Sequence, residues 1–581
     1  MVEAGERRIC VGSARTTPRA SHPEDTAGTG ENGTGLLSYA SLVDGKNVPS
    51  DRWVYVVDSD ALLEDAFTSL TLKRKLESGR LAPEDLPGGS IVGRVARADQ
   101  ETVLQAVEAA SRATAEWNAF PLEERLDRFG ALLHRRLAEK ADRTIEILLR
   151  EGHPLALARW QVSGALECFG PESLAFYRSQ MLHESRHGER RISVRRRPDG
   201  VVCLNPPQNA PLSSALLGVT AMMAGNSLVV RAPRSAPLGV MYVLHEVVAP
   251  VLQELGAPGG TLNVVCGDPA PVLSTWLDSP LVDDVMYFGS SEAGMRFQER
   301  CVASGKKPIL ELAGNDAVVV WKDADLEYAA EALTESFYGS GQLCMIPNQV
   351  LAHPDVTDRL VALLAEKARE VRGGSVRDEE VLLTPVLRNE KFFACLDDAL
   401  ARGAELVCGG HAMQADGTRD TAGIFLEPTV VLVRGMAEAR EIQAVRHETF
   451  FPLLPVVAAE PAPDTVLLDR FVDFVNSNPY GLRNSVWARD PEVVDHFVTR
   501  ITKGGLLKVN DSHIGFLPGL PTHGGTGLTG GVYGEANYPI LRTSHIQGVS
   551  VSDGGIRPRD AVFGAWRAMR HDGAETDAAA G

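Results

Sequence analysis

Cys344 is one of eight cysteines in the chain, and it ends a glycine-rich segment, YGSGQLC (338–344). A cysteine on a loop beside a helix can have a lowered pKa, and the thiolate that results is a strong nucleophile. A cysteine is more often a small buried apolar residue, and this alternative is the stronger one for any single cysteine. Cys344 is therefore a candidate nucleophile whose role depends on its neighbours.

Two polar residues stand in unusual surroundings. Glu311 lies inside the apolar run LELAG (310–314). It either faces solvent at a strand end, which is the favoured interpretation without further context, or occupies a pocket that raises its pKa and suits a general base. Asn209 lies between prolines in PPQNAP (206–211). The prolines fix a loop and can aim the amide at a site, although such an Asn usually caps a turn.

A third feature is GSSEAG (289–294), which follows the apolar run DVMYF and begins a predicted helix. Glycine lets a ligand approach the backbone, and a helix N-terminus offers free N–H groups to a phosphate. Gly289, Ser290 and Gly294 are therefore candidates for binding a phosphate group. The alternative is that the segment is only a turn, which is the usual role of such a pattern.

Short apolar runs alternate with predicted helices through the middle of the chain. The runs are VVCL (201–204), SLVV (227–230), TLNVV (261–265), DVMYF (284–288) and DAVVV (316–320). Helical periodicity separates them, for example at 237–255, 269–278 and 291–304. This order is typical of an α/β fold with a parallel sheet covered on both faces. The alternation restarts near residue 350, which predicts a second α/β unit.

Length and charge restrict the class of protein. A chain of 581 residues is too long for one hydrophobic core, so two or more domains are expected. The net charge of -18 argues against affinity for nucleic acid or anionic membranes. The N-terminus has no apolar signal region, and the cysteines are scattered without the spacing of a zinc site. We therefore expect a cytoplasmic protein with reduced thiols, no metal, and no nucleic-acid or membrane partner.

Taken in order, the motifs PxNxP, GSxxxG, ELxG and GQxC, at 207–211, 289–294, 311–314 and 341–344, closely resemble the aldehyde dehydrogenase superfamily. LNVVCG (262–267), HETFFP (447–452) and NPYGLRNSVWARD (478–490) are similar to further family segments, and the resemblance covers roughly residues 90–550. It implies a Rossmann-like cofactor domain, an α/β catalytic domain and a small oligomerisation β-flap.

The resemblance also implies a mechanism. Cys344 is the nucleophile, Asn209 stabilises the oxyanion, and Glu311 activates the water that hydrolyses a thioester. The substrate is a small-molecule aldehyde and the cofactor is NAD or NADP. The positions that match the family's cofactor-binding residues are Arg231, Gly289, Ser290, Gly294, Glu448 and Phe450.

The sequence departs from the family pattern at several positions. Arg234 stands where relatives commonly have a Glu that bonds the adenosine ribose. Its guanidinium either pairs with a 2′-phosphate, which would favour NADP, or turns outward to a nearby acid and leaves no preference. Gln208 and Ala210 replace a Trp and an aromatic residue beside the oxyanion residue. Downstream, Ser213, Ser214 and Leu217 lie on a segment that lines the substrate tunnel in relatives, and the small residues there suggest a roomier or more polar tunnel. The usual Pro-Phe-Gly-Gly-like segment reads PTHGG (521–525).

We divide the chain as follows: a disordered tail 1–36, an extended N-terminal segment with an insertion 37–90, a cofactor domain 91–310 with a flap strand near 189–203, a catalytic domain 311–510, a C-terminal return with an oligomerisation strand 511–553, and a flexible tail 554–581. The segments 189–203 and 541–551 are similar to strands that relatives exchange between subunits, so we expect a homodimer or homotetramer.

Two other functions are alternatives to the oxidation of an aldehyde to a carboxylic acid. A CoA-acylating dehydrogenase would pass the acyl group to CoA, but such relatives commonly lack a carboxylate at the position of Glu311. A non-catalytic protein on the same scaffold would act by binding, but it would be expected to lose Cys344, Asn209 or Glu311. All three are present, so oxidation of an aldehyde to a carboxylic acid is favoured.

Overall fold

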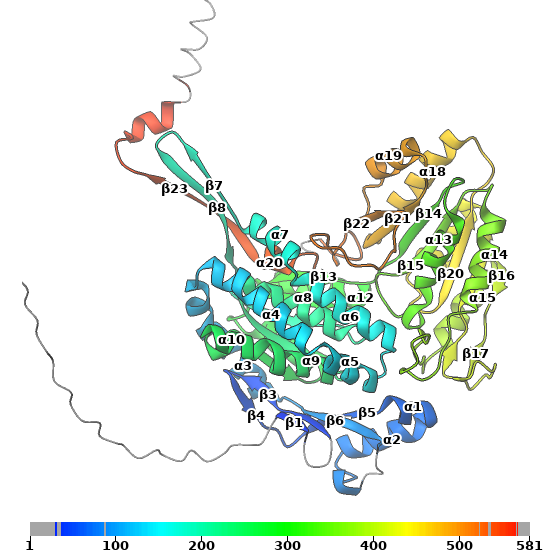
Figure 1. Cartoon of the computed structure of the whole chain (residues 1–581), viewed down its shortest axis with the longest axis horizontal. Coiled ribbons are helices and arrows are strands. Elements are labelled where there is room, and N and C mark those ends of the chain that lie inside the picture. The colour runs from blue at the N-terminus through cyan, green and yellow to red at the C-terminus, as the bar shows by residue number, and fades with distance from the viewer. Residues whose placement is uncertain are drawn as a thin grey trace, which may run out of the picture.

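The computed structural model describes residues 29–31, 36–85, 89–521, 523–532, 536–564 and 566. Two seven-stranded sheets lie in two lobes, each covered by helices (Figure 1). The central strands of both sheets run parallel to one another. The predicted α/β fold class is therefore confirmed.

The sheet of the first lobe has the strand order β13-β12-β9-β10-β11-β3-β4. The bounds are β13 Lys307–Glu311, β12 Asp284–Phe288, β9 Val201–Asn205, β10 Ser227–Ala232, β11 Leu262–Cys266, β3 Ser41–Val43 and β4 Lys46–Val48. Strands β9, β10 and β11 are buried along their whole length, because helices cover both faces, and this explains their uninterrupted apolar runs.

The helices of the first lobe are α3 Gln100–Ala119, α4 Phe129–Glu139, α5 Ala141–Arg150, α6 Leu155–Cys168, α7 Pro171–Met181, α8 Pro211–Met223, α9 Leu238–Val243, α10 Ala249–Leu255, α11 Pro269–Asp278 and α12 Ser291–Ala303. The stretch Leu238–Leu255 is long enough to cross a membrane and has a mean hydropathy of 1.3, but 67% of it is buried inside the protein. Its position in the core accounts for its apolar composition.

The sheet of the second lobe has the order β16-β19-β20-β15-β14-β21-β22. Its strands are β16 Glu405–Cys408, β19 Thr429–Arg434, β20 Leu453–Ala458, β15 Pro347–Ala352, β14 Asp316–Val320, β21 Arg483–Trp487 and β22 Leu506–Val509. Its main helices are α13 Leu326–Leu333, α14 Thr357–Ala368, α15 Glu390–Ala401, α18 Asp464–Asn476 and α19 Pro491–Arg500. The chain passes from the first sheet to the second between β13 and β14, so Glu311 lies at the junction of the lobes.

The N-terminal segment adds a smaller layer below the first lobe (Figure 1). Its four-stranded sheet has the order β1 Thr29–Glu31, β2 Leu37–Tyr39, β6 Ile91–Ala96 and β5 Trp53–Val57. The insertion forms α1 Ser59–Glu64 and α2 Ala66–Glu77, and the carboxylate of Asp65 caps α2 by accepting the N–H of Thr68. Strand β1 departs from the disordered tail that the sequence predicts over 1–36; the rest of that range, except Leu36, lies outside the described residues.

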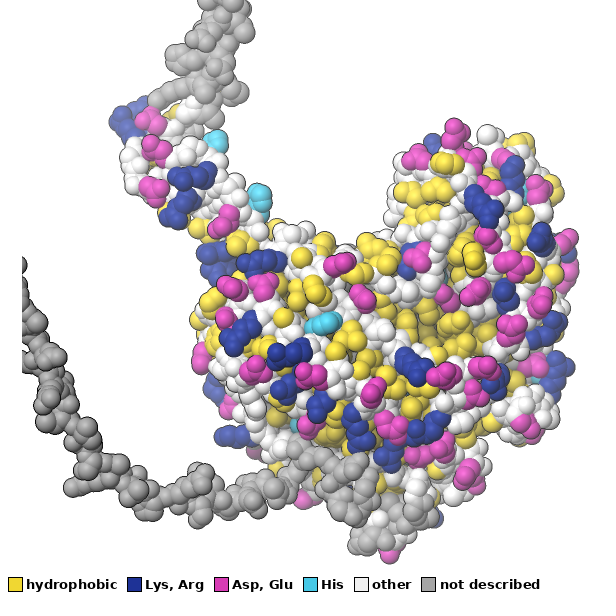
Figure 2. Space-filling model, in the orientation of Figure 1, with side chains coloured by type: hydrophobic (Ala, Val, Ile, Leu, Met, Phe, Trp, Pro, Cys, Tyr) yellow, Lys and Arg dark blue, Asp and Glu magenta, His cyan; other side chains and the backbone are white. Residues whose placement is uncertain are grey.

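A three-stranded arm projects from the first lobe (Figure 1). It consists of β23 Ser544–Ser552, β8 Arg190–Pro198 and β7 Leu182–His187 in that order. After β23, residues 558–564 are helical, which departs from the predicted flexible tail. Figure 2 shows acidic and basic side chains interspersed along the arm and over the body of the molecule on this face.

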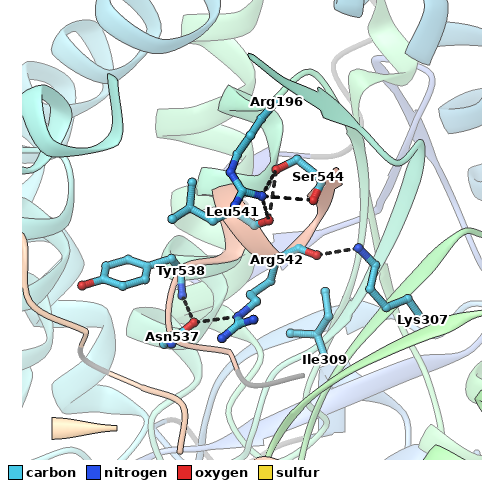
Figure 3. Close-up of a pocket in the computed structure, with 8 residues that line it drawn as sticks. All are labelled: Arg196, Lys307, Ile309, Asn537, Tyr538, Leu541, Arg542 and Ser544. Carbon is cyan, nitrogen blue, oxygen red and sulfur yellow. Dashed lines mark hydrogen bonds between the residues drawn. The ribbon is translucent and has the colours of Figure 1, made fainter. Parts of the chain in front are cut away.

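Hydrogen bonds at the foot of the arm attach it to the first lobe. They surround a cavity of about 370 Å³ (Figure 3). Nη1 of Arg196 donates to the carbonyl oxygens of Leu541, at 2.9 Å, and Ser544, at 3.3 Å. Nζ of Lys307 donates to the carbonyl oxygen of Arg542 at 2.7 Å. These cations therefore serve to fix the direction in which the arm projects.

Candidate active site

A cavity of about 850 Å³ is lined by residues of both lobes. Cys344, Glu311 and Asn209 all line it, although up to 135 positions separate them in the sequence. The structure thus brings together the three residues that the sequence analysis assigns to catalysis. One wall of the cavity follows the carboxyl ends of β9, β10 and β12, which is where open α/β sheets bind ligands.

Cys344 follows a tight turn after α13. Residues 339–341 have left-handed backbone conformations, with φ between 56° and 73°. Burial, together with the carboxylates of Glu311 and Glu448, raises the pKa of the Cys344 thiol well above its usual value. The lowered pKa that a loop position permits is therefore not found, because enclosure and nearby negative charge outweigh the effect of the loop.

Glu311 is the last residue of β13 and only 2% exposed. Its Oε2 accepts the backbone N–H of Gly524 at 2.6 Å. Gly524 has a φ of 99°, and a Cβ there would lie 2.6 Å from that of Asn537, so glycine is required at this position. The solvent-facing interpretation of Glu311 is wrong: its carboxylate is buried in the cavity wall, where a general base is useful.

Asn209 lies just before α8. The helix has Ala210 as its N-cap without a side-chain cap bond, so Asn209 does not act as the helix cap. Instead its Nδ2 donates to the carbonyl oxygen of Gln342 at 2.8 Å, two residues before Cys344. An amide nitrogen carries two hydrogens, so the same group has a second N–H for an oxyanion at Cys344.

The residues of the GSSEAG segment (289–294) have two different roles. Gly289 and Ser290 line the cavity, and the Ser290 hydroxyl caps α12 by accepting the N–H of Ala293 at 3.3 Å. Gly294 does not appear among the lining residues. A Cβ on Gly294 would collide with the side chain of Leu312, so this glycine allows α12 to pack against the sheet. The N-terminus of α12 therefore faces the cavity with its unpaired N–H groups.

Two arginines near the carboxyl end of β10, one within the strand and one just after it, have different surroundings. Arg231 is 3% exposed and lines the cavity, and its Nε donates to Oδ1 of Asn205 at 2.6 Å. Arg234 is not among the residues that line the cavity. Its Nη2 lies 2.8 Å from Oε2 of Glu77, and its Nη1 pairs with Asp268. Its guanidinium is therefore bound by two acids, as in the alternative that directs it away from a 2′-phosphate.

Glu448 and Phe450 line the cavity from the second lobe. Oε1 of Glu448 accepts the N–H of Gly314 at 2.9 Å. Burial raises the pKa of Glu448 to about 8, although that hydrogen bond opposes the shift. Phe450 has a φ of 59°, in the left-handed region that non-glycine residues rarely adopt. Such local strain is commonly kept where a side chain must be held at a site.

Two parts of the site were not assigned from the sequence. The backbone N–H of Gly524 holds Glu311, and its neighbour His523 lines the cavity and is 5% exposed. The ring of His523 meets Phe288 edge-on, with centroids 5.9 Å apart. The feature of the sequence that could have pointed to them is the PTHGG segment (521–525), which differs from the family pattern but to which the sequence alone assigns no role. Trp160, stacked on Phe516 at 5.0 Å, is a further wall of the cavity.

Known proteins are similar to this chain along most of its length. The model of the aldehyde dehydrogenase family matches residues 82–542. The chain is 28% identical over 463 residues to the NADP-dependent succinate-semialdehyde dehydrogenase of Escherichia coli, covering 78% of this chain and 91% of that one. It is 29% identical over 486 residues to a 1-pyrroline-5-carboxylate dehydrogenase of Anoxybacillus flavithermus, covering 80% and 88%.

A crystal structure of an NAD-dependent aldehyde dehydrogenase from Sinorhizobium meliloti has a TM-score of 0.74 and 25% sequence identity, covering 91% of this chain and 98% of that one. The match to the family model spans most of the chain. The resemblance drawn from the four motifs is thereby confirmed. The chain belongs to the aldehyde dehydrogenase family and is an oxidoreductase that converts an aldehyde to a carboxylic acid with NAD or NADP.

Proposed function

We propose that the reaction proceeds by covalent catalysis on Cys344, with Asn209 and Glu311 as its partners. The observation that carries this proposal is that one cavity contains all three side chains. A thiol, an amide donor and a buried carboxylate supply a nucleophile, an oxyanion donor and a base. The roles follow from what each group can do at that position.

The first half of the reaction starts from the thiolate of Cys344, which lines the cavity with Glu311 and whose proton is released to solvent. The thiolate sulfur then forms a bond to the aldehyde carbon, and the carbonyl electron pair moves to oxygen. Asn209 and the backbone N–H of Cys344 stabilise the oxyanion. When bound, NAD or NADP accepts a hydride ion, which is the chemistry that leaves a thioester on Cys344. Glu311 then takes a proton from water, the hydroxide attacks the thioester, and the thiolate leaves.

The residues at the other end of the cavity suit a dinucleotide. Arg231, the Ser290 hydroxyl and the N–H groups at the start of α12 are donors for a diphosphate. We assign Glu448 and Phe450 to the nicotinamide ribose, because both line the cavity and the carboxylate of Glu448 is close enough to Cys344 to help raise the pKa of its thiol. Gly289 lets the backbone approach the diphosphate, and Gly294 supports it by packing.

The arm favours self-association. Within the described residues, its outer strands β7 and β23 each have one edge that pairs with no other strand, and Ile546 and Val551 on β23 are 64% and 41% exposed. An exposed edge of this kind is a template for pairing with a strand of another chain. We propose a homodimer or homotetramer that acts in the cytoplasm without a nucleic-acid or membrane partner, as the charge of -18 supports. Light scattering that finds only monomer at micromolar concentration would contradict the oligomer.

The experiment that tests the mechanism compares Cys344→Ala with Cys408→Ala, a second half-buried cysteine, on β16. An aldehyde panel is assayed with each cofactor by absorbance of the reduced nicotinamide, and the organic product is identified. Cys344→Ala should lose turnover while cofactor binding persists, and Cys408→Ala should match the wild type. Turnover that survives in Cys344→Ala would refute the nucleophile. If the product is an acyl-CoA that forms only when CoA is added, the acyl group is transferred to CoA and the thioester is not hydrolysed.

A further inference from the structure

Helix α2 of the insertion reaches the first lobe through one ion pair. Oε2 of Glu77, the last residue of α2, lies 2.8 Å from Nη2 of Arg234. Nη1 of the same guanidinium pairs with Asp268, which follows β11. One cation is thus held between two carboxylates, of which Asp268 also pairs with Arg97. Glu77 comes from a segment that precedes residue 82, where the match to the family begins.

This ion pair lies at the rim of the 850 Å³ cavity. Arg231, three residues before Arg234, lines the cavity, and so does Pro269, which directly follows Asp268. The two segments follow β10 and β11, which are neighbouring parallel strands, so both leave the sheet at its carboxyl edge. Arg234 and its acids therefore stand beside the part of the cavity that Arg231 and Pro269 line.

A dinucleotide in this cavity has only one orientation that permits reaction. Its nicotinamide must lie near Cys344, where the hydride is transferred, and its diphosphate near Arg231 and Ser290. The adenosine ribose then extends towards Pro269 and the rim. The 2′ position is the only difference between NAD and NADP, so the groups at this rim decide between the two cofactors.

The position of Glu77 is fixed from several sides. Its Oε1 accepts the N–H of Tyr55 on β5 at 3.4 Å, and Nζ of Lys73 lies 3.9 Å from the same oxygen. Only 17% of the Glu77 side chain is exposed, against 33% for Arg234. Because Glu77 is held by the strand below it and by its own helix, the carboxylate is placed for Arg234 before any ligand arrives.

We propose that Glu77 makes this chain prefer NAD to NADP. The inference rests on the proposed function in one respect, namely that the cavity holds the cofactor as described. A 2′-phosphate needs a guanidinium to pair with, and here that guanidinium already has two carboxylate partners. The same carboxylates repel the two negative charges that the phosphate brings. A ribose hydroxyl meets neither obstacle, because it is uncharged and can donate to a carboxylate.

The test is the ratio of the NADP and NAD dissociation constants in the wild type, Glu77→Gln and the double variant Glu77→Gln/Arg234→Gln, measured by calorimetric titration. Wild type should bind NAD more tightly. Glu77→Gln removes the carboxylate partner of Nη2 of Arg234, so this nitrogen can pair with a 2′-phosphate. The ratio should therefore move towards NADP by about 10- to 100-fold, the value of one charge-assisted contact. The double variant should lose most of that gain, because the guanidinium that receives the phosphate is absent.

The matched control is Glu64→Gln, which removes the same charge from an exposed position on α1. It should leave the ratio at the wild-type value. If Glu77→Gln fails to fold, Asp268→Asn frees Arg234 from its other partner and should shift the ratio in the same direction. An unchanged ratio in both variants overturns the inference while leaving the mechanism on Cys344 intact. A wild type that binds neither cofactor overturns both.

Discussion

The backbone N–H of Gly524 donates to Oε2 of Glu311 over 2.6 Å, and 213 positions separate the two residues in the sequence. The bond joins the end of β13 to a loop that returns from the second lobe. A backbone donor cannot rotate away as a side chain can, so it holds the carboxylate in one orientation. The base for hydrolysis is therefore positioned by the C-terminal part of the chain.

Glu311→Gln should separate the two halves of the reaction. The amide cannot accept a proton from water, so hydrolysis of the thioester should slow by about 100- to 10,000-fold. Formation of the thioester needs the thiolate but not the activated water. Rapid mixing should therefore show a burst of reduced nicotinamide close to one equivalent per site, followed by a very slow steady state. A variant without a burst would contradict this separation, because it would show that Glu311 is needed to form the thioester.

Gly524→Ala tests the support of Glu311. The substitution places a side chain at a φ of 99° and 2.6 Å from Cβ of Asn537, so the loop must move. The matched control is Gly554→Ala, which has a φ of 105° and open space around the added Cβ. Backbone strain of about 1–3 kcal/mol is common to both variants. Steady-state turnover should fall only in Gly524→Ala, and equal turnover in both would contradict the positioning role.

Asn209→Ala should lower kcat by about 100- to 1,000-fold, which is the usual cost of removing one oxyanion donor. The KM for the aldehyde should change little, because the donor acts on a charge that develops only in the transition state. Steady-state kinetics with one aldehyde at saturating cofactor measure both constants. A rise in KM with an unchanged kcat would show that Asn209 binds the aldehyde and does not stabilise the oxyanion.

The raised pKa of Glu448 predicts that the stability of the protein depends on pH. Burial raises its pKa to about 8 in the folded protein from an ordinary value of about 4.5, so the folded state retains a proton that the unfolded state has lost. The stability that this protonated form contributes is complete below about pH 4.5 and is lost as the pH rises through about 8. Glu448→Gln remains neutral, so its free energy of unfolding should exceed that of wild type by about 4–5 kcal/mol at pH 8.5 and by less than about 1 kcal/mol at pH 5. Urea unfolding at both pH values measures this difference. The same gap at both would exclude titration of Glu448 as its cause.

Much of the fold and the centre of the site could be predicted from the sequence. Fully buried parallel strands such as β10 require uninterrupted apolar runs, and these runs can be recognised in the sequence alone. Cys344, Glu311 and Asn209 were found because each lies in a local motif whose order along the chain is distinctive. Local sequence could not show the bond from Gly524 to Glu311. Such contacts depend on how distant segments pack, and the packing leaves no periodic signal in either segment.

The same limit applies to charge. A sequence shows Arg234 but cannot show which acid it will meet, because its partner Glu77 lies 157 positions away. Two alternatives for this residue are compatible with the sequence, and only the position of α2 distinguishes them. Similarly, a loop position permits a lowered pKa for Cys344. In the folded chain, burial and two carboxylates that are distant in sequence but close in space raise this pKa. Electrostatic surroundings are a property of the folded chain.

His523 should decide which aldehydes are preferred. Burial and the nearby guanidinium of Arg483 lower the pKa of its imidazole to about 3, so the ring is neutral at physiological pH. It is then too weak a base to activate water, but it can still form a hydrogen bond in the cavity wall. We therefore expect a hydroxylated aldehyde to gain from this contact, whereas an alkyl aldehyde of the same length does not.

His523→Phe replaces the imidazole by a ring without a polar atom. It should lower kcat/KM for the hydroxylated aldehyde by about tenfold, the cost of one neutral hydrogen bond. The alkyl aldehyde should change by less than about twofold, because its contacts are with the ring face in both proteins. His523→Asn restores a polar group and should recover part of the loss. An equal fall for both aldehydes would mean that His523 acts only through its neighbour Gly524 and the placement of Glu311, and the preference would then have to come from another part of the cavity wall.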